Sequence, residues 1–414
     1  MTADRGSAEP SVATEDGART RRRALRPGRA LTAGLGVASI VALAGCTNGL
    51  GLVTVPATES QATIIADFLG SKNLTFEDEP TVTVQDGRID RVVVTPSNGS
   101  GRIGGSLEKG GKQWTVDSTE LDFGTSYDVK ATAVDLRGKP TTVTDSFKTF
   151  VPEREVTMET NVWDGSTYGV GMPITVTFSE PIQKKADIES RLHVNVKNKK
   201  VDGEVVGAWN WETDQQVTYR PKKYWPANSK ITLDADIRGV HAGDGAYPME
   251  DQTRDITIGS RNILTVDTAS HQMTFNRNGK NISTIPISSG RPGMDTRNGT
   301  WLMMSKERNT VFTADTAESD PEYYRLNIDY AMRFTWSGQY LHSAPWSVGS
   351  QGYSNVSHGC VNMSTGNAAW VMNESNVGDV IRVVNSPRPG YEGDGWTQWM
   401  VSWKDWKSGS ALEG

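Results

Sequence analysis

Alternation of apolar and polar residues dominates this chain from about residue 60 to residue 287, and it predicts a protein made mainly of β-strands. The alternating apolar positions include Val82, Val84, Val92, Val94, Val129, Ala131 and Ala133. Successive side chains of a strand point to opposite faces, so this pattern gives one buried face and one solvated face. Frequent turn residues between the short runs favour sandwiches or barrels over isolated sheets.

Two of these β-rich stretches repeat one another at a fixed spacing. The first pair of matching positions is Leu121 and Trp225, and 225 − 121 = 104. Five further pairs have the same spacing: Gly124 and Asn228, Tyr127 and Ile231, Val129 and Leu233, Ala131 and Ala235, Ala133 and Ile237. The repeat predicts two immunoglobulin-like β-sandwiches, at residues 60–151 and 152–258. Tyr127 stands where a tyrosine corner or an ordinary core aromatic is expected.

A third β-rich region is expected at residues 259–387. It contains an Asn278-Gly279 turn of the kind found in hairpins. Ser364 can cap a helix that runs through residues 367–372, just after Cys360. The C-terminal tail, residues 388–414, carries four tryptophans at helical spacing, which are Trp396, Trp399, Trp403 and Trp406. An apolar stripe at that period predicts a helix with one buried face, and we favour burial over a sugar-stacking surface.

The first 46 residues have the composition of an export signal. Six arginines lie in residues 19–29, and an uncharged stretch then runs to Leu43-Ala44-Gly45-Cys46. This ending resembles a bacterial lipobox, so we expect Cys46 to carry a diacylglycerol and residues 47–59 to form a tether. The alternatives are a signal that ends in cysteine by chance and an uncleaved anchor helix. Residues 20–26 also resemble a twin-arginine signal, so export by the Sec route and export by the twin-arginine route both remain open.

Removal of this segment would leave an acidic, exported protein on the outer face of the cytoplasmic membrane. Residues 1–46 hold seven arginines and four acids, so the balance becomes 36 − 45 = −9. A net negative charge argues against a nucleic-acid partner.

The segment Ser357-His358-Gly359-Cys360 contains one of the two cysteines in the chain. If Cys46 carries lipid, Cys360 has no disulfide partner in a compartment where paired cysteines oxidise, which favours a reactive thiol. A thiol needs a base or a nearby cation to become a strong nucleophile, and His342 and His358 both lie close in sequence. We find no His/Asp/His ligand spacing among the five histidines, so no metal is expected.

This arrangement closely resembles the signature of the YkuD-type L,D-transpeptidases, a family that cross-links bacterial peptidoglycan. Four further segments resemble landmarks of the family: Ser288–Arg291, Thr296–Gly299, His342–Ser347 and Gly378–Ile381. The resemblance covers about residues 259–387, and the two modules before it resemble the mycobacterial-type members. Many relatives outside that group have arginine where this chain has Asn362.

The resemblance implies a role for each site residue. Cys360 is the nucleophile and His342 the base, held through the backbone carbonyl of Ser343, with His358 in a supporting role. The N–H groups of Gly359 and Cys360 are suited to receive an oxyanion. Substrate-binding positions are Tyr324 (with Tyr323 as the alternative), Trp346, Ser357 and Asn362. Residues 309–326 are expected to form a mobile loop, either a lid over the site or an ordinary acidic surface loop.

The resemblance also implies the reaction and its partners. A donor stem tetrapeptide would lose its terminal D-Ala to form a thioester, which the side-chain amine of a second stem resolves into a 3→3 cross-link. By the same resemblance no cofactor is required, and carbapenem β-lactams are the expected covalent inhibitors. An L,D-carboxypeptidase and a papain-like endopeptidase remain open as alternatives, with a non-catalytic wall-binding module disfavoured by the unpaired thiol.

Overall fold

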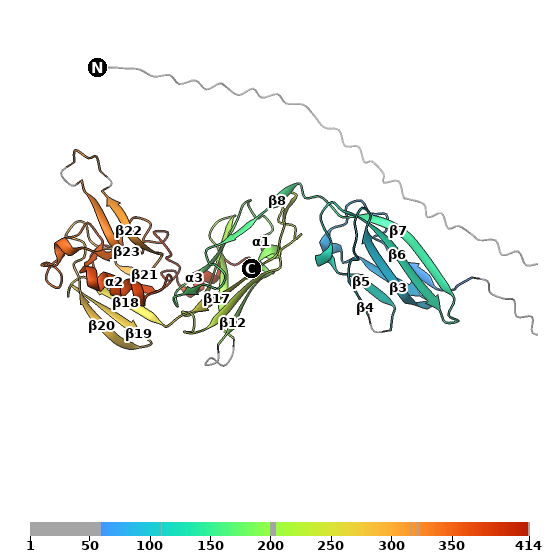
Figure 1. Ribbon diagram of the computed structural model, residues 1–414, viewed down its shortest axis with the longest axis horizontal. Helices are drawn as coiled ribbons and strands as arrows, with labels where there is room; N and C mark the ends of the chain where they lie inside the picture. The colour runs from blue at the N-terminus through green and yellow to red at the C-terminus, as the bar shows by residue number, and fades with distance from the viewer. Residues whose placement is uncertain (1–58, 109, 199–203, 315, 321–322, 413–414) are drawn as a thin grey trace, which may run out of the picture. The chain divides into compact units, whose positions relative to one another are not determined.

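The computed structural model describes residues 59–108, 110–198, 204–314, 316–320 and 323–412 (Figure 1). The predicted export signal, Cys46 and all but the last residue of the predicted tether lie outside these residues. Strands make up 44% and helices 8% of the described residues, which confirms the prediction of a mainly β protein. Within the described ranges, no helix is both long enough and apolar enough to cross a membrane.

The first sandwich consists of two sheets around one apolar core. One sheet has the order β1 (Thr63–Ile65), β2 (Thr81–Gln85), β5 (Gln113–Val116), β4 (Gly105–Leu107), and the other β3 (Gly87–Pro96), β6 (Ser126–Asp135), β7 (Pro140–Lys148). Most of the alternating residues predicted to point inward, such as Val82 and Val129, are buried, whereas Val92 is only partly buried. Tyr127 is buried too, and its hydroxyl accepts a hydrogen bond at 2.7 Å from the N–H of Asp122, five residues upstream. This bond to upstream backbone is the arrangement of a tyrosine corner.

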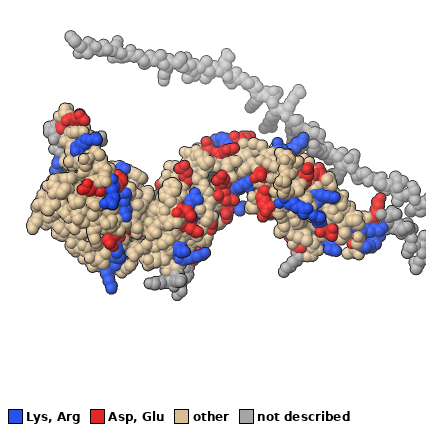
Figure 2. All heavy atoms as spheres, viewed as in Figure 1, with Lys and Arg blue, Asp and Glu red and all other residues tan. Residues whose placement is uncertain are grey.

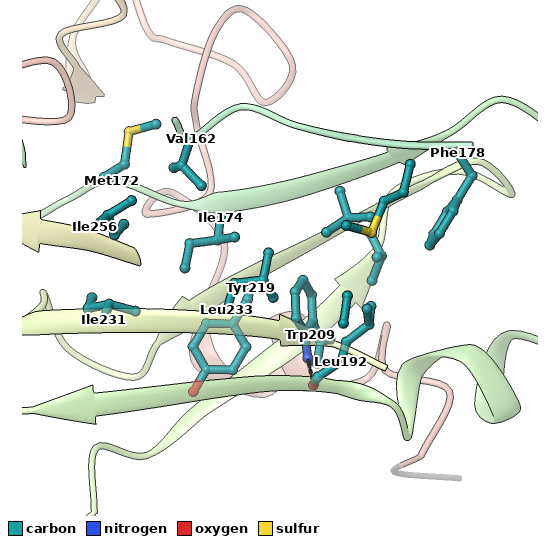
Figure 3. Packing of buried hydrophobic residues seen from close by; sticks show 14 of the residues in the cluster. Val162, Met172, Ile174, Phe178, Leu192, Trp209, Tyr219, Ile231, Leu233 and Ile256 are labelled. Carbon is teal, nitrogen blue, oxygen red and sulfur yellow. Dashed lines mark hydrogen bonds between the residues drawn. The ribbon is translucent and has the colours of Figure 1, made fainter. Parts of the chain in front are cut away.

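The second sandwich repeats this plan. Its sheets have the orders β10 (Thr167–Tyr168), β17 (Gln252–Ile258), β15 (Lys230–Ala235), β12 (Leu192–Lys197) and β13 (Gly207–Trp211), β14 (Gln216–Pro221), β11 (Ile174–Phe178), β9 (Met158–Thr160). A small pair, β8 (Arg154–Val156) with β16 (Ala246–Pro248), and the short helix α1 (Lys185–Glu189) complete it. Strands β6 and β15 are the two members of the predicted repeat. Figure 3 shows side chains of both sheets, among them Ile174 and Ile231, gathered in the interior.

Apolar packing continues across the predicted boundary at residues 258 and 259. Ile263, Leu302 and Val380 belong to the same buried cluster as the second sandwich. The N–H of Gly169 donates to the carbonyl of Val377 at 2.7 Å, and a Cβ on Gly169 would lie 2.2 Å from the backbone N of Asp379. Only glycine fits this close backbone approach.

The third region contains two sheets and one longer helix. The sheets have the orders β20 (Lys280–Pro286), β19 (Gln272–Arg277), β18 (Asn262–Asp267), β26 (Val380–Val384), β21 (Gly299–Leu302) and β22 (Ser305–Thr313), β23 (Arg325–Arg333), β24 (Tyr340–Ser343), β25 (Val361–Met363). Helix α2 (Thr365–Glu374) begins after Ser364, whose side chain accepts from the N–H of Asn367 at 3.3 Å. The predicted cap is therefore confirmed.

The prediction that residues 309–326 form one loop is wrong at both ends. Strand β22 continues to Thr313 and strand β23 begins at Arg325. The two strands project as a hairpin in Figure 1. The register pairs Val311 with Asn327 and Phe312 with Leu326. β-branched and aromatic residues favour strands, and this preference outweighs the polar residues on which the loop prediction rested.

The tail also differs from its prediction, because among its described residues, 388–412, only α3 (Trp403–Lys407) is helical. Trp396 and Trp399 precede the helix, which begins only after Ser402, whose backbone is extended (φ −61°, ψ 153°) and whose side chain caps the first turn. The burial of the stripe is confirmed in part, since Trp406 is 2% exposed and Trp396 and Trp399 pack against the second sandwich.

The described surface carries both signs of charge. Figure 2 shows Lys and Arg interspersed with Asp and Glu over the face in view. Such mixing accords with the acidic composition and offers no broad basic area on that face to a polyanion.

Candidate active site

A cavity of about 380 Å³ contains the two residues on which the predicted chemistry depends, Cys360 and His342. Twelve residues line it: Phe312, Tyr324, Leu326, His342, Trp346, Ser347, Ser350, Val356, Ser357, His358, Cys360 and Asn362. The four predicted substrate-binding positions are all among them. A larger cavity of about 710 Å³ lies elsewhere, between Phe76 and Asp251, and has no cysteine or histidine in its wall.

Pairing of β24 with β25 brings the base and the nucleophile together. The two strands are parallel, with Leu341 opposite Val361 and His342 opposite Asn362. Cys360 therefore lies directly before the first residue of β25, the strand that pairs with the one carrying His342. Gly359, just before it, has φ +128°, a backbone conformation that L side chains rarely adopt.

His342 is held as a neutral base. Its Nδ1 lies 2.9 Å from the carbonyl oxygen of Ser343, which can only accept, so Nδ1 carries the proton and Nε2 is free to receive one. Burial lowers the pKa of His342 to about 4, while hydrogen bonds with Ser343 and Asn362 act in the opposite direction. Phe312 packs edge-on with a ring separation of 5.2 Å. At neutral pH the imidazole is thus uncharged and ready to accept a proton.

Cys360 rests as a thiol. Its Sγ donates to the carbonyl oxygen of Gly338 at 3.6 Å. Burial raises its pKa to about 11, against a smaller lowering effect from a hydrogen bond with the backbone of Tyr340. The residue as a whole is only partly buried, so a substrate carbonyl can approach the sulfur from the cavity. The thiolate must therefore form during the attack, with transfer of the proton to a base.

His358 occupies a different position from His342. It is exposed, its Nε2 lies 3.2 Å from a guanidinium nitrogen of Arg291, and its ring is 5.3 Å from that of Tyr324. A guanidinium always donates, so Nε2 accepts and the bond requires an unprotonated Nε2. Tyr324, rather than Tyr323, is the tyrosine in the cavity wall, since the hydroxyl of Tyr323 contacts Glu318.

The remaining predicted residues form the frame of the cavity. Ser357 is buried, its hydroxyl donates to the carbonyl of Cys360 at 2.6 Å, and it accepts from the N–H of Gly359 at 3.1 Å. The amide of Gly359 is therefore engaged in this state. Asn362 is 4% exposed, lines the cavity, and donates to the hydroxyl of Ser347 at 3.1 Å. Trp346, 54% exposed, is open to a ligand.

Ser350 and Val356 of the cavity wall were not predicted from the sequence, and three residues that hold the nucleophile loop, the base or the thiol were given no role. Thr296 accepts from the N–H of Gly290 at 3.0 Å and donates to the carbonyl of Gly359 at 2.8 Å, which fixes the loop before the nucleophile. Phe312 covers the base, and Gly338 accepts from the thiol. The resemblance at Thr296–Gly299 marked the first of these as part of a landmark without giving it a role.

The described part of the chain contains no group of three or more His, Cys, Asp or Glu residues that could hold a metal ion. The cavity brings together a buried neutral imidazole, a thiol and nearby amides. Together they suit acyl transfer by a cysteine nucleophile.

Comparison with known proteins places this site in a family. A profile for the L,D-transpeptidase catalytic domain (YkuD) matches residues 261–384, and one for a bacterial Ig domain matches residues 71–241. The chain is similar to L,D-transpeptidase 2 of Mycobacterium tuberculosis, with 29% identity over 92% of this chain and 95% of the relative. It is 31% identical to L,D-transpeptidase 5 of the same organism, over 80% of this chain and 73% of the relative. The chain belongs to the L,D-transpeptidase family.

A solved structure of the LD transpeptidase LdtMt1 in complex with imipenem has 34% identity, a TM-score of 0.47, and covers 56% of this chain and all of that one.

Proposed function

We propose that this protein forms 3→3 cross-links in peptidoglycan through a thioester on Cys360. The observation that carries the proposal is that the Cys360 thiol lines the same cavity as a buried imidazole, His342, whose Nδ1 is bonded to the Ser343 carbonyl so that Nε2 can accept a proton. Family membership supports the L,D-transpeptidase reaction, and the geometry supports a cysteine as its nucleophile.

The proposed first half-reaction acylates the enzyme. Sγ of Cys360 attacks the carbonyl of the third residue of a donor tetrapeptide while Nε2 of His342 takes the thiol proton. The tetrahedral intermediate collapses as the C–N bond to D-Ala breaks, and the proton passes from His342 to the leaving amine. The products are free D-Ala and a thioester.

The second half-reaction returns the thiol. The side-chain amine of a second stem attacks the thioester carbonyl, His342 removes a proton from that amine, and the sulfur leaves and regains a proton. A new amide replaces the thioester. Energy for this amide comes from the bond to D-Ala, so no nucleotide is needed.

The oxyanion of each intermediate needs hydrogen-bond donors. The backbone N–H of Cys360 is suited to this by its position on the nucleophile. The N–H of Gly359 can contribute only if it leaves, or shares, the hydroxyl of Ser357 to which it now donates. Ser357 is thereby a candidate for tuning the site as the intermediate forms.

Product analysis tests the proposal. A soluble protein starting at residue 59, incubated with disaccharide tetrapeptide, should yield a dimer whose mass equals two substrates minus one D-Ala. Fragmentation should place the new amide between the two third residues. Monomer lacking D-Ala as the sole product would instead establish an L,D-carboxypeptidase, with water as acceptor, and unchanged substrate would refute both.

We also propose that Cys46 is diacylated and anchors the enzyme at the outer face of the cytoplasmic membrane, where the peptidoglycan substrate lies. The proposal rests on the Leu-Ala-Gly-Cys ending of the apolar run. Mass spectrometry of the mature N-terminal peptide should show a lipidated cysteine, and Cys46→Ala should release the protein from the membrane or leave it unprocessed. A mature N-terminus beyond residue 46 without lipid would contradict this.

A further inference from the structure

A tight turn, residues 335–338, connects β23 to β24 and places a carbonyl against the nucleophile. The N–H of Gly338 donates to the carbonyl of Thr335 at 3.4 Å, and the Thr335 hydroxyl accepts from the N–H of Gln339 at 2.9 Å. Gly338 has φ +88°, which favours glycine at this point of the turn. The carbonyl oxygen of Gly338 then accepts from Sγ of Cys360. The position of this turn therefore decides what the thiol faces.

Asp394, from the C-terminal tail, pins the turn. Its Oδ1 accepts from the N–H of Ser337 at 2.6 Å and its Oδ2 from the Ser337 hydroxyl at 2.7 Å. Its own carbonyl accepts from the N–H of Trp336 at 3.3 Å. The carboxylate is 2% exposed, so these bonds are shielded from competing water. Three contacts from one residue thus fix two consecutive residues of the turn.

Arg297 balances the buried charge. Its Nε lies 3.3 Å from Oδ2 of Asp394, which makes the two side chains an ion pair. The geometry does not meet the criteria for a hydrogen bond from this Nε. The backbone N–H of Arg297 donates to the side chain of Gln339, the residue after the turn, at 3.0 Å. The arginine and the aspartate therefore hold the same turn from two sides.

The far end of the tail is bound to the second sandwich. The side chain of Trp399 donates to the carbonyl of Gly171 at 2.7 Å, and that of Asn210 to the carbonyl of Trp406 at 2.8 Å. Arg220 of β14 donates to the carbonyl of Val401 at 2.9 Å. One segment of chain thus joins the sandwich to the turn beside the nucleophile.

We propose that Asp394 is a positioning residue for the transferase reaction: through Ser337 it holds the Gly338 carbonyl against the Cys360 thiol, which keeps the thiol protonated and oriented until substrate arrives. The proposal deepens the proposed function and rests on it. The tail is then a strap that sets the active-site turn, with the second sandwich as its anchor.

Release of the turn should change the rates of two reactions of Cys360, alkylation and acylation, in opposite directions. A carbonyl oxygen beside sulfur stabilises the thiol over the thiolate, so release of the turn lowers the pKa of Cys360 and exposes more thiolate. Loss of one neutral hydrogen bond corresponds to about a 2- to 10-fold change in an equilibrium constant. Alkylation of the thiol at a fixed pH should therefore become faster, whereas substrate acylation, which needs the ordered turn, should become slower.

The experiment compares variants of the protein starting at residue 59, in which Cys360 is the single cysteine. Asp394→Asn, nearly the same in shape, and Asp394→Ala should raise the iodoacetamide alkylation rate near pH 8 by about 2- to 10-fold. Both should lower acylation by tetrapeptide by about tenfold or more, with the larger effect for alanine. Ser337→Ala, which keeps the backbone bond and the charge, should show a smaller change of the same signs.

Asp405→Ala is the matched control. Asp405 is on the same tail, and its side chain accepts from the hydroxyl of Ser402 at 2.6 Å in the cap of α3, away from residues 335–338 in the chain. This variant should leave both rates unchanged. Unaltered rates in folded Asp394→Asn would overturn the proposal, as would a parallel fall of both rates together with the melting temperature. The alkylation arm needs no substrate, so it tests Asp394 even if the proposed cross-linking fails.

Discussion

His342→Ala should slow acylation of Cys360 by about 10²-fold or more, because the thiol then loses the group that takes its proton during attack. The wild-type imidazole is neutral above a pKa of about 4, and the thiol stays protonated up to about 11. The reactive protonation state, a neutral imidazole with a neutral thiol, is therefore the predominant one at every pH between these two pKa values. Wild-type acylation should be nearly flat from about pH 5 to pH 9.

The variant should have a different pH profile. Without a base, only the small thiolate fraction reacts, so its rate should rise by about tenfold per pH unit over the same range. Single-turnover acylation measured across that range compares the two slopes. His358→Ala is the informative control, because His358 lies beside Arg291 and Tyr324, and its loss should lower the rate while the profile stays flat. If His358→Ala acquires the steep profile and His342→Ala does not, the base is His358.

Cys360→Ala should abolish covalent capture of a carbapenem, the second large effect expected here. The strained lactam carbonyl presents the same electrophile as the donor stem, and ring opening by sulfur retains the whole inhibitor on the protein. The protein starting at residue 59 should gain one inhibitor mass, localised to the peptide that contains Cys360. Since no other cysteine is present in that protein, the variant should gain none. An adduct of equal yield on Cys360→Ala would refute the assignment.

The two sandwiches could be predicted because each depends on local signals. Period-two alternation places Val82 and Val129 inward, and the 104-residue spacing aligns Tyr127 with Ile231 on equivalent strands β6 and β15. The errors fell where tertiary context outweighs local pattern. Phe312 belongs to a hairpin instead of a loop because it pairs with Leu326 and packs on His342. The tail helix is short because Ser402 adopts an extended backbone (φ −61°, ψ 153°) and caps the helix there, so that it begins only at Trp403.

The site was predictable only as far as its motif reaches. Cys360, His342 and Ser343 belong to recognisable segments, and the carbonyl of Ser343 does orient the imidazole. Burial of His342, and hence its neutral state, depends on Phe312 from another strand. The contact of Asp394 with Ser337 joins residues 57 apart in the chain. Neither contact belongs to a sequence pattern, because each arises only when separate segments pack together.

The most direct test of the cysteine mechanism is to trap the acyl-enzyme with a stem that can act only as donor. The protein starting at residue 59 is mixed with disaccharide tetrapeptide whose side-chain amine is acetylated, in acid-quenched single turnover, and its intact mass and the released D-Ala are measured together. We predict a mass increase equal to the donor minus D-Ala, located on the peptide of Cys360, matched by one D-Ala per protein and absent from Cys360→Ala. D-Ala release at the wild-type rate by Cys360→Ala, or an adduct on another residue, would contradict it.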